Sequence, residues 1–193
     1  MYFVMTCLSP LQRDHAVLKH RKDHPLRSWH SGTPFRPEAA QAHKQPPAEP
    51  ILARILPGDE GEMAELWDNP VPLMTRRLYE RLSASGVDNL DIYTAEIREE
   101  ASGRVYDEYV AFNLIGKVAA ADLNASTYTD THPPMIDGGF TSLHIDAGKA
   151  RNLLLFRLAE AVNAIVAHER IKSAVESAGI RTLTFIPPEH WGT

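Results

Sequence analysis

Two stretches of this chain, 93 positions apart, follow the same residue plan. Three residues recur at equivalent positions: Arg77 and Arg170, Gly86 and Gly179, and Leu90 and Leu183. Elsewhere in the two copies apolar residues correspond to apolar residues. Each copy consists of an apolar entry, a short amphipathic helix, a glycine stop and a strand. Neither copy carries a catalytic signature, which favours a scaffold that presents a surface.

The helix in each copy is predicted from the spacing of its apolar residues. Leu78 and Leu82 lie four positions apart, as do Ile171 and Val175, so each pair lines one face of a helix. Thr75 stands where an N-cap of the first helix is expected, because its hydroxyl can accept a hydrogen bond from a free backbone amide.

The end of each helix is predicted at a glycine. Gly86 and Gly179 follow the apolar pairs at the position where a left-handed C-terminal cap needs no side chain. The segments that follow, residues 90–97 and 182–186, are rich in β-branched and aromatic residues and are predicted strands.

The middle of the chain is predicted to be sheet. Residues 90–97 and 105–114 flank a polar connection that contains Ser102-Gly103, which is typical of a hairpin. The second strand becomes apolar on both faces towards its end, so that end is expected to lie inside the sheet. Residues 143–146 alternate like a further strand. The predicted fold is α+β, with a mixed or mainly antiparallel sheet flanked by the helices of two similar helix-to-strand units.

Charge divides the chain unevenly. Residues 1–50 contain seven Lys and Arg against four Asp and Glu, five of the nine His and several Pro, while the remainder carries a balance of −8. We therefore predict a first strand and a basic, His/Pro-rich extension within residues 1–50, packed on an α+β domain of residues 51–193. A single cysteine, Cys7, excludes an internal disulfide, and no apolar run reaches the roughly 18 residues of a membrane span. These features favour a cytoplasmic protein.

Several weak motifs in a fixed order resemble a known family. They are Pro72 to Leu78, Asn113 to Val118 with Asp122-Leu123, Phe156 to Glu160, and the close from Ile165 to Pro187. Together they resemble the eleventh immunity-protein family of bacterial polymorphic toxin systems, over roughly residues 65–190. The resemblance implies a non-enzymatic protein that binds and neutralises a co-encoded toxin domain, in many cases a nuclease. It implies no catalytic residues and no cofactor.

An acidic stretch is the candidate partner-binding surface. Five carboxylates fall within ten residues, with no Lys or Arg from Ile55 to Thr75 and with one Trp beside them: Asp59, Glu60, Glu62, Glu65, Asp68 and Trp67. A nuclease is basic around its phosphate-binding site, so an opposing negative surface speeds association and a buried aromatic residue adds affinity. The alternative interpretation is a solvated helix start with Trp67 in the core.

Two other function classes remain open. The histidines His15, His20, His24 and His30 suggest a small metal-dependent enzyme, although the neighbouring Lys and Arg oppose a cation. The cations Arg13, Lys19, Arg21, Lys22 and Arg27 suggest a nucleic-acid-binding module, which the formal net charge of −5 opposes. His168 with Glu169 could form an acid–base pair, but a histidine at a helix start more often caps or packs.

Overall fold

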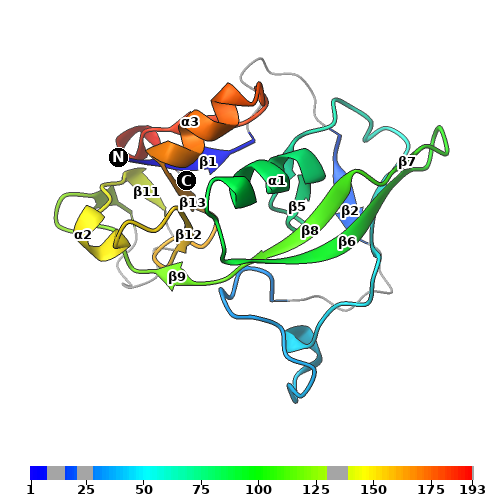
Figure 1. Cartoon of the computed structure of the whole chain (residues 1–193), viewed down its shortest axis with the longest axis horizontal. Coiled ribbons are helices and arrows are strands. Elements are labelled where there is room, and N and C mark those ends of the chain that lie inside the picture. Colours follow the sequence, from blue (N-terminus) through cyan, green and yellow to red (C-terminus); the bar gives the residue numbers. More distant parts are fainter. Residues whose placement is uncertain (8–15, 21–27, 130–138, 193) are drawn as a thin grey trace.

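A computed structural model of the chain describes residues 1–7, 16–20, 28–129 and 139–192. The fold is α+β with mixed sheets, as predicted, and its strands divide between two larger sheets (Figure 1). Only the pairs β3/β6 and β9/β12 are parallel among the strand pairs of the described residues.

The five-stranded sheet has the order β14 (Thr184–Ile186), β1 (Tyr2–Thr6), β13 (Ile165–His168), β12 (Leu155–Leu158) and β9 (Lys117–Val118). The seven-stranded sheet has the order β2 (Leu18–His20), β3 (Ile51–Ile55), β6 (Leu90–Glu99), β8 (Tyr109–Leu114), β5 (Leu73–Thr75) and β4 (Leu66–Trp67), with β7 (Val105–Tyr106) paired to β6. A small pair joins β10 (Thr127–Tyr128) and β11 (Phe140–Ser142). The helices are α1 (Arg76–Ala84), α2 (Ala147–Ala150) and α3 (Glu169–Ser177), with 3-10 turns η1 (Ala42–Lys44) and η2 (Pro188–His190).

Both predicted helices are present and begin at side-chain caps. The Thr75 hydroxyl accepts a hydrogen bond from the Leu78 amide at 3.2 Å. In α3 the equivalent residue, His168, accepts from the Arg170 amide at 3.3 Å through Nδ1. Each helix is followed by a glycine with a left-handed backbone, as predicted, with φ of 98° at Gly86 and 71° at Gly179. The role of His168 is therefore capping.

The duplication seen in the sequence extends to the sheets. In each unit the strands before and after the helix, β5 and β6 or β13 and β14, flank a third strand antiparallel to both. That third strand is β8 in the first unit and β1 in the second. The central rows of paired residues are Leu73, Ala111 and Tyr93 in one sheet, and Val166, Val4 and Ile186 in the other. The outer members of the two rows again differ by 93 positions.

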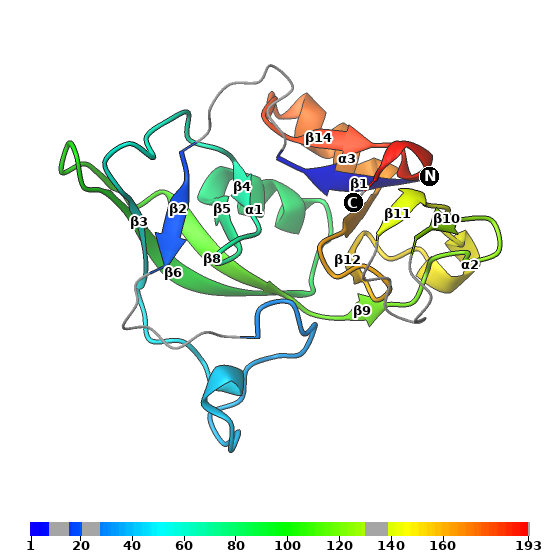
Figure 2. The same ribbon diagram turned by 180° about the vertical axis from the view of Figure 1, so that it is seen from behind.

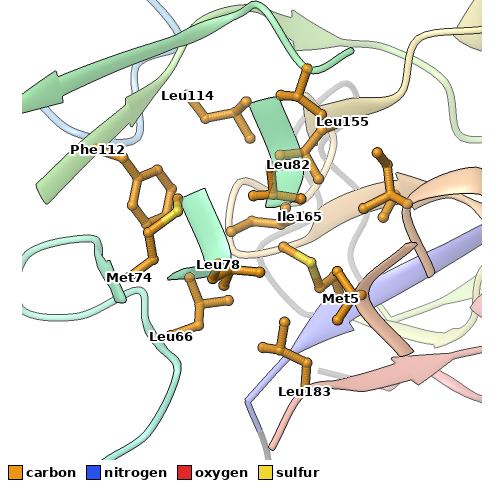
Figure 3. Packing of buried hydrophobic residues seen from close by; sticks show 14 of the residues in the cluster. Met5, Leu66, Met74, Leu78, Leu82, Phe112, Leu114, Leu155, Ile165 and Leu183 are labelled. Carbon is orange, nitrogen blue, oxygen red and sulfur yellow. The ribbon is translucent and has the colours of Figure 1, made fainter. Parts of the chain in front are cut away.

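One apolar core is shared by the two units. Leu78 and Leu82 of α1, and Ile171 and Val175 of α3, are all 0 % exposed and belong to a single cluster. Both helices lie on the same side of the molecule and contact each other (Figure 1). Figure 3 shows Leu78 and Leu82 of α1 inside the cluster. Alternate strand residues point away from it into two outer clusters, one behind each sheet.

The predicted hairpin is confirmed. β6 and β7 pair antiparallel across the turn at Ser102 and Gly103, and β8 continues along β6. All six residues of β8 are buried, because β5 and β6 cover its edges and clusters cover both faces. The strand predicted at residues 143–146 is wrong. β11 ends at Ser142, Ile145 makes an isolated bridge to Ala121, and Asp146 caps α2.

The first 50 residues contribute to both sheets. β1 lies between β13 and β14, and β2 forms an outer strand beside β3 (Figure 2). Trp29 and Phe35 are buried and pack edge-on at 5.0 Å between ring centroids, with Tyr93 beside them. The boundary at residue 50 between an extension and a domain stays a prediction.

Candidate functional site

The acidic stretch connects β3 to β5 as a loop of residues 56–65, the acidic loop, followed by the short strand β4. The solvated helix start of the alternative interpretation is wrong, because the helix begins only at Arg76. Pro57, Gly58 and Gly61 explain why, since proline and glycine disfavour helix interiors. The carboxylates are therefore presented on irregular backbone. The second part of that interpretation, Trp67 in the core, is confirmed in that Trp67 is partly buried against the outer cluster of the seven-stranded sheet.

The fold supplies cations that the local sequence lacks. Within the described residues, ion pairs to other segments are formed by Asp59 with Lys19 at 3.6 Å, by Glu65 with Arg77 at 4.0 Å, and by Asp68 with Arg157 at 2.8 Å. The stretch is thus less negative than its sequence suggests. The six predicted residues lie along one connection, but they do not all face solvent.

Asp68 is the most strongly engaged of the five. Both of its carboxylate oxygens accept from the Arg157 guanidinium, at 2.8 and 2.9 Å, and Arg157 is 0 % exposed. His30 Nε2 lies 3.3 Å from the same carboxylate. Burial opposes the charge of Asp68, but hydrogen bonds and positive charge from His30 and Arg157 outweigh it and hold the pKa of this carboxyl below its usual value. Asp68 therefore joins the two sheets.

This ion pair also follows the duplication. Asp68 comes directly after Trp67, which pairs with Leu73, and Arg157 comes directly after Phe156, which pairs with Val166. Leu73 and Val166 are equivalent residues of the two units. Asp68 and Arg157 thus occupy equivalent places, and the two units contact each other through a matched pair of opposite charges.

Trp67 is half-buried and fixed on two sides. Its indole Nε1 donates to the Ala16 carbonyl at 3.3 Å, and its ring packs on Tyr109 with centroids 5.4 Å apart. The Tyr109 hydroxyl in turn donates to the Ala64 carbonyl at 2.9 Å. These contacts hold the end of the acidic stretch against the seven-stranded sheet.

Glu60 and Glu62 are the exposed members of the stretch. Glu60 accepts a hydrogen bond from the Gly58 amide at 2.7 Å, which orders the turn after β3. The backbone carbonyls of Asp59 and Glu62 accept from the amides of Val17 and Ala16, at 2.9 and 3.2 Å. The loop is therefore anchored through its backbone while these two side chains face outward.

Two adjoining cavities open beside Trp67. The larger, of about 560 Å³, is mostly apolar and includes Val17, Ala64 and Leu66 in its walls. The smaller, of about 220 Å³, includes Asp68 and Ile165, and so reaches the five-stranded sheet. The acidic loop and Trp67 thus border a groove at the junction of the two units, which is referred to below as the junction groove.

The residues behind the other two function classes are only partly described. His15, His24, Arg13, Arg21, Lys22 and Arg27, and the side chain of His20, lie outside the described residues. His30 contacts Asp68, and Lys19 pairs with Asp59. Among the side chains that the structure describes, no group of three potential metal ligands comes together.

Sequence reasoning missed Arg157 as a partner of the acidic stretch. A signal was present, because Arg157 is the sole charge in the apolar run from Leu153 to Ala159. A cation in such a run is expected to be buried and to require a carboxylate. The sequence alone does not say which carboxylate, since 89 positions separate the partners.

The described residues form an α+β scaffold with an acidic loop and a groove at the junction of its two units. The chain belongs to the immunity protein family (Imm11), which it matches over residues 11–189. This membership supports an immunity role. A search of curated proteins found no match to the chain. No helix within the described ranges is long and apolar enough to cross a membrane.

Proposed function

We propose that this chain neutralises a cognate bacterial toxin of a polymorphic toxin system by binding it directly in a one-to-one complex, without catalysis. The observation that carries the proposal is the family match, which spans residues 11–189. The protein acts in the cytoplasm in this proposal, where the toxin would otherwise reach its target.

Stoichiometry tests the mechanism. The toxin domain encoded beside this protein should be neutralised in cells that co-express the two, and the purified pair should co-elute. Titration against a fixed amount of toxin should reach full inhibition at an equimolar ratio, because binding removes one toxin per molecule. Complete protection at far below equimolar amounts would overturn direct binding and would favour an enzyme.

A nuclease is the toxin class that the acidic loop fits best. Glu60 and Glu62 are exposed, and the neighbouring Asp59 pairs with the Lys19 ammonium. Such a surface attracts the basic phosphate-binding face of a nuclease and raises the rate of association. The junction groove offers an apolar seat beside these charges. Its proposed occupant is a toxin segment in which an apolar side chain is flanked by Lys or Arg.

The proposed binding surface keeps all six residues, but with separate roles. Glu60 and Glu62 steer the toxin, and the exposed part of Trp67 anchors it in the junction groove. Asp59, Glu65 and Asp68 are engaged by cations of this chain and hold the surface in shape. The steering charges of Glu60 and Glu62 affect the rate of association, whereas the contacts of Trp67 affect the rate of dissociation.

Reversing two exposed charges is expected to slow toxin binding. The variant Glu60→Lys/Glu62→Lys should associate about tenfold more slowly at low ionic strength, because steering of this kind changes on-rates by factors of about 10 to 10³. The difference should shrink in 1 M salt, where the Debye length is about 3 Å. Stopped-flow or surface-based kinetics with the cognate toxin measure both rates.

The matched control is Glu80→Lys/Glu189→Lys, which makes the same charge change at exposed acids of α1 and η2. Its association rate should change much less. Equal slowing in both variants would assign the effect to net charge and would reject the acidic loop as the steering surface, while leaving toxin binding itself intact.

A further inference from the structure

A polar cavity of about 590 Å³ lies at the far end of the five-stranded sheet from β14, where β9 meets the turn around α2. Three cations from separate positions line it: Lys117, Lys149 and Arg151. Asp146 and the half-exposed Leu153 also line this cavity. The cavity is distinct from the junction groove, with which it shares no lining residue.

Lys117 is held in place by a close approach of two loops. The Gly116 amide donates to the Gly32 carbonyl at 2.8 Å. A Cβ at Gly32 would lie 2.7 Å from Lys117 Cγ, so only glycine allows the loop to pack on the stem of this lysine. The packing limits the side-chain freedom of Lys117, and so less entropy is lost when its ammonium binds a ligand.

Arg151 reaches the cavity through an uncommon backbone conformation. It ends α2 with φ of 49°, and Asn152 follows with φ of 59°, so two successive residues with side chains are left-handed. This conformation is uncommon outside glycine and persists where the surrounding structure holds it, often at functional sites. Here it turns the chain so that both Arg151 and Leu153 line the cavity.

The positive charge of the cavity is only partly compensated. Lys149 Nζ lies 3.9 Å from Asp146 and donates to the Ala121 carbonyl at 3.2 Å. The other Asp146 oxygen accepts from the amides of Gly148 and Lys149, so these amides are already used. Within the described residues, Lys117 and Arg151 have no ion-pair partner. Counted over the side chains that the structure describes, the cavity therefore carries two positive charges in excess, in a chain whose formal net charge is −5.

The carboxyl of Glu160 also interacts electrostatically with Lys149. Glu160 is 4 % exposed, and burial raises its pKa although hydrogen bonds from backbone amides and the charge of Lys149 act in the opposite direction. Its burial keeps this carboxyl out of the lining of the cavity. It does not supply a counter-charge at the surface where Lys117 and Arg151 end.

We propose that Lys117, Lys149 and Arg151 bind a small multivalent oxyanion in this cavity. A guanidinium and two ammonium groups are the donors that recognise phosphate and carboxylate oxygens, and an excess of two positive charges favours an anion with more than one negative charge. The volume is within the range of about 300–1,000 Å³ of small-molecule sites. The polar lining selects an ionic ligand. This site does not depend on the proposed toxin binding.

Titration calorimetry on the full chain tests the site with two probes, inorganic pyrophosphate and citrate, in a chloride buffer. Lys117→Ala/Lys149→Ala/Arg151→Ala should weaken binding at least tenfold. The control Lys44→Ala/Arg81→Ala/Arg170→Ala removes the same charge from exposed cations elsewhere and should change affinity less than twofold. Preference for pyrophosphate identifies a phosphate compound as the ligand class, and preference for citrate a polycarboxylate.

Chemical-shift changes locate the binding independently of the variants. In the native chain the probe should perturb the backbone amides of Lys117, Gly148 and Leu153 and should leave the acidic loop unchanged. If the triple variant does not fold, Arg151→Ala alone should still weaken binding severalfold. The proposal is overturned if neither probe saturates the native chain, or if the triple variant and its control lose affinity equally.

Discussion

Replacing Asp68 by alanine is expected to lower the free energy of unfolding by about 3–5 kcal/mol, because it leaves a buried guanidinium without its counter-charge. Arg157 is 0 % exposed, and both of its terminal nitrogens donate to Asp68. In a chain of this size the melting temperature should fall by roughly 10 °C. Urea denaturation followed by circular dichroism measures the change.

The matching control removes both charges together. Asp68→Leu/Arg157→Met should recover most of the lost stability, because replacing a buried ion pair by apolar groups of similar volume is often neutral or stabilising. An Asp68→Ala variant as stable as the native chain would show that Arg157 reaches water or another partner. The Asp68–Arg157 ion pair would then not hold the two sheets together.

The same pair gives stability a defined pH dependence. The pKa of Asp68 is lowered in the folded chain, so its contribution is fully present above the unfolded value of about 3.9. That contribution is lost as the pH falls through the lower folded value. Asp68→Asn has no carboxyl to titrate, and its unfolding free energy should therefore decrease less than that of the native chain below about pH 4.

The parts of the fold that could be predicted from sequence are those with local signals. The helices follow from pairs such as Leu78 and Leu82 and from the glycine four positions after the second apolar residue. The hairpin was predicted in the same way, from the turn signal at Gly103. The offset of 93 positions between the two copies was the most informative feature of the sequence, because residues 93 positions apart also occupy equivalent places in the two sheets.

The arrangement of the strands could not be predicted, because it depends on distant partners. β1 inserts between β13 and β14, whereas β8 follows its own unit along the chain, and no local pattern distinguishes these two solutions. The strand predicted at residues 143–146 failed for a related reason. Alternation of apolar and polar residues matches the two-residue repeat of a strand, but it does not show whether a neighbouring strand is there to pair with it. Asp146 instead caps a helix of four residues.

The acidic site was predicted as composition, and the structure changed what that composition means. A count of charges between Ile55 and Thr75 shows five carboxylates and no cation. In the part of the chain that the structure describes, the fold brings Lys19 to Asp59, Arg77 to Glu65 and Arg157 to Asp68. Long-range ion pairs of this kind are decided by topology. Local charge density therefore overstates the negative potential of a loop whose partners lie elsewhere in the chain.

Truncating either of two equivalent core residues should be strongly destabilising. Leu78 of α1 and Ile171 of α3 are 93 positions apart, both are 0 % exposed, and both belong to the shared cluster. Leu78→Ala and Ile171→Ala should each lower the free energy of unfolding by about 2–5 kcal/mol, because each removes apolar contacts and leaves a cavity. Val105→Ala, at a residue that is 49 % exposed, is the control and should change stability by about 0.5 kcal/mol or less.

The combination of the two substitutions tests whether the units share one core. Since both side chains contribute to one cluster, unfolding should remain a single transition in each variant, detected alike by circular dichroism and tryptophan fluorescence. Residues that share packing are expected to deviate from additivity by about 0.5–3 kcal/mol in the double variant. Two separate transitions, each moved by one substitution only, would mean that the duplicated units are independently stable and that the junction between them, including Asp68 and Arg157, contributes little to folding.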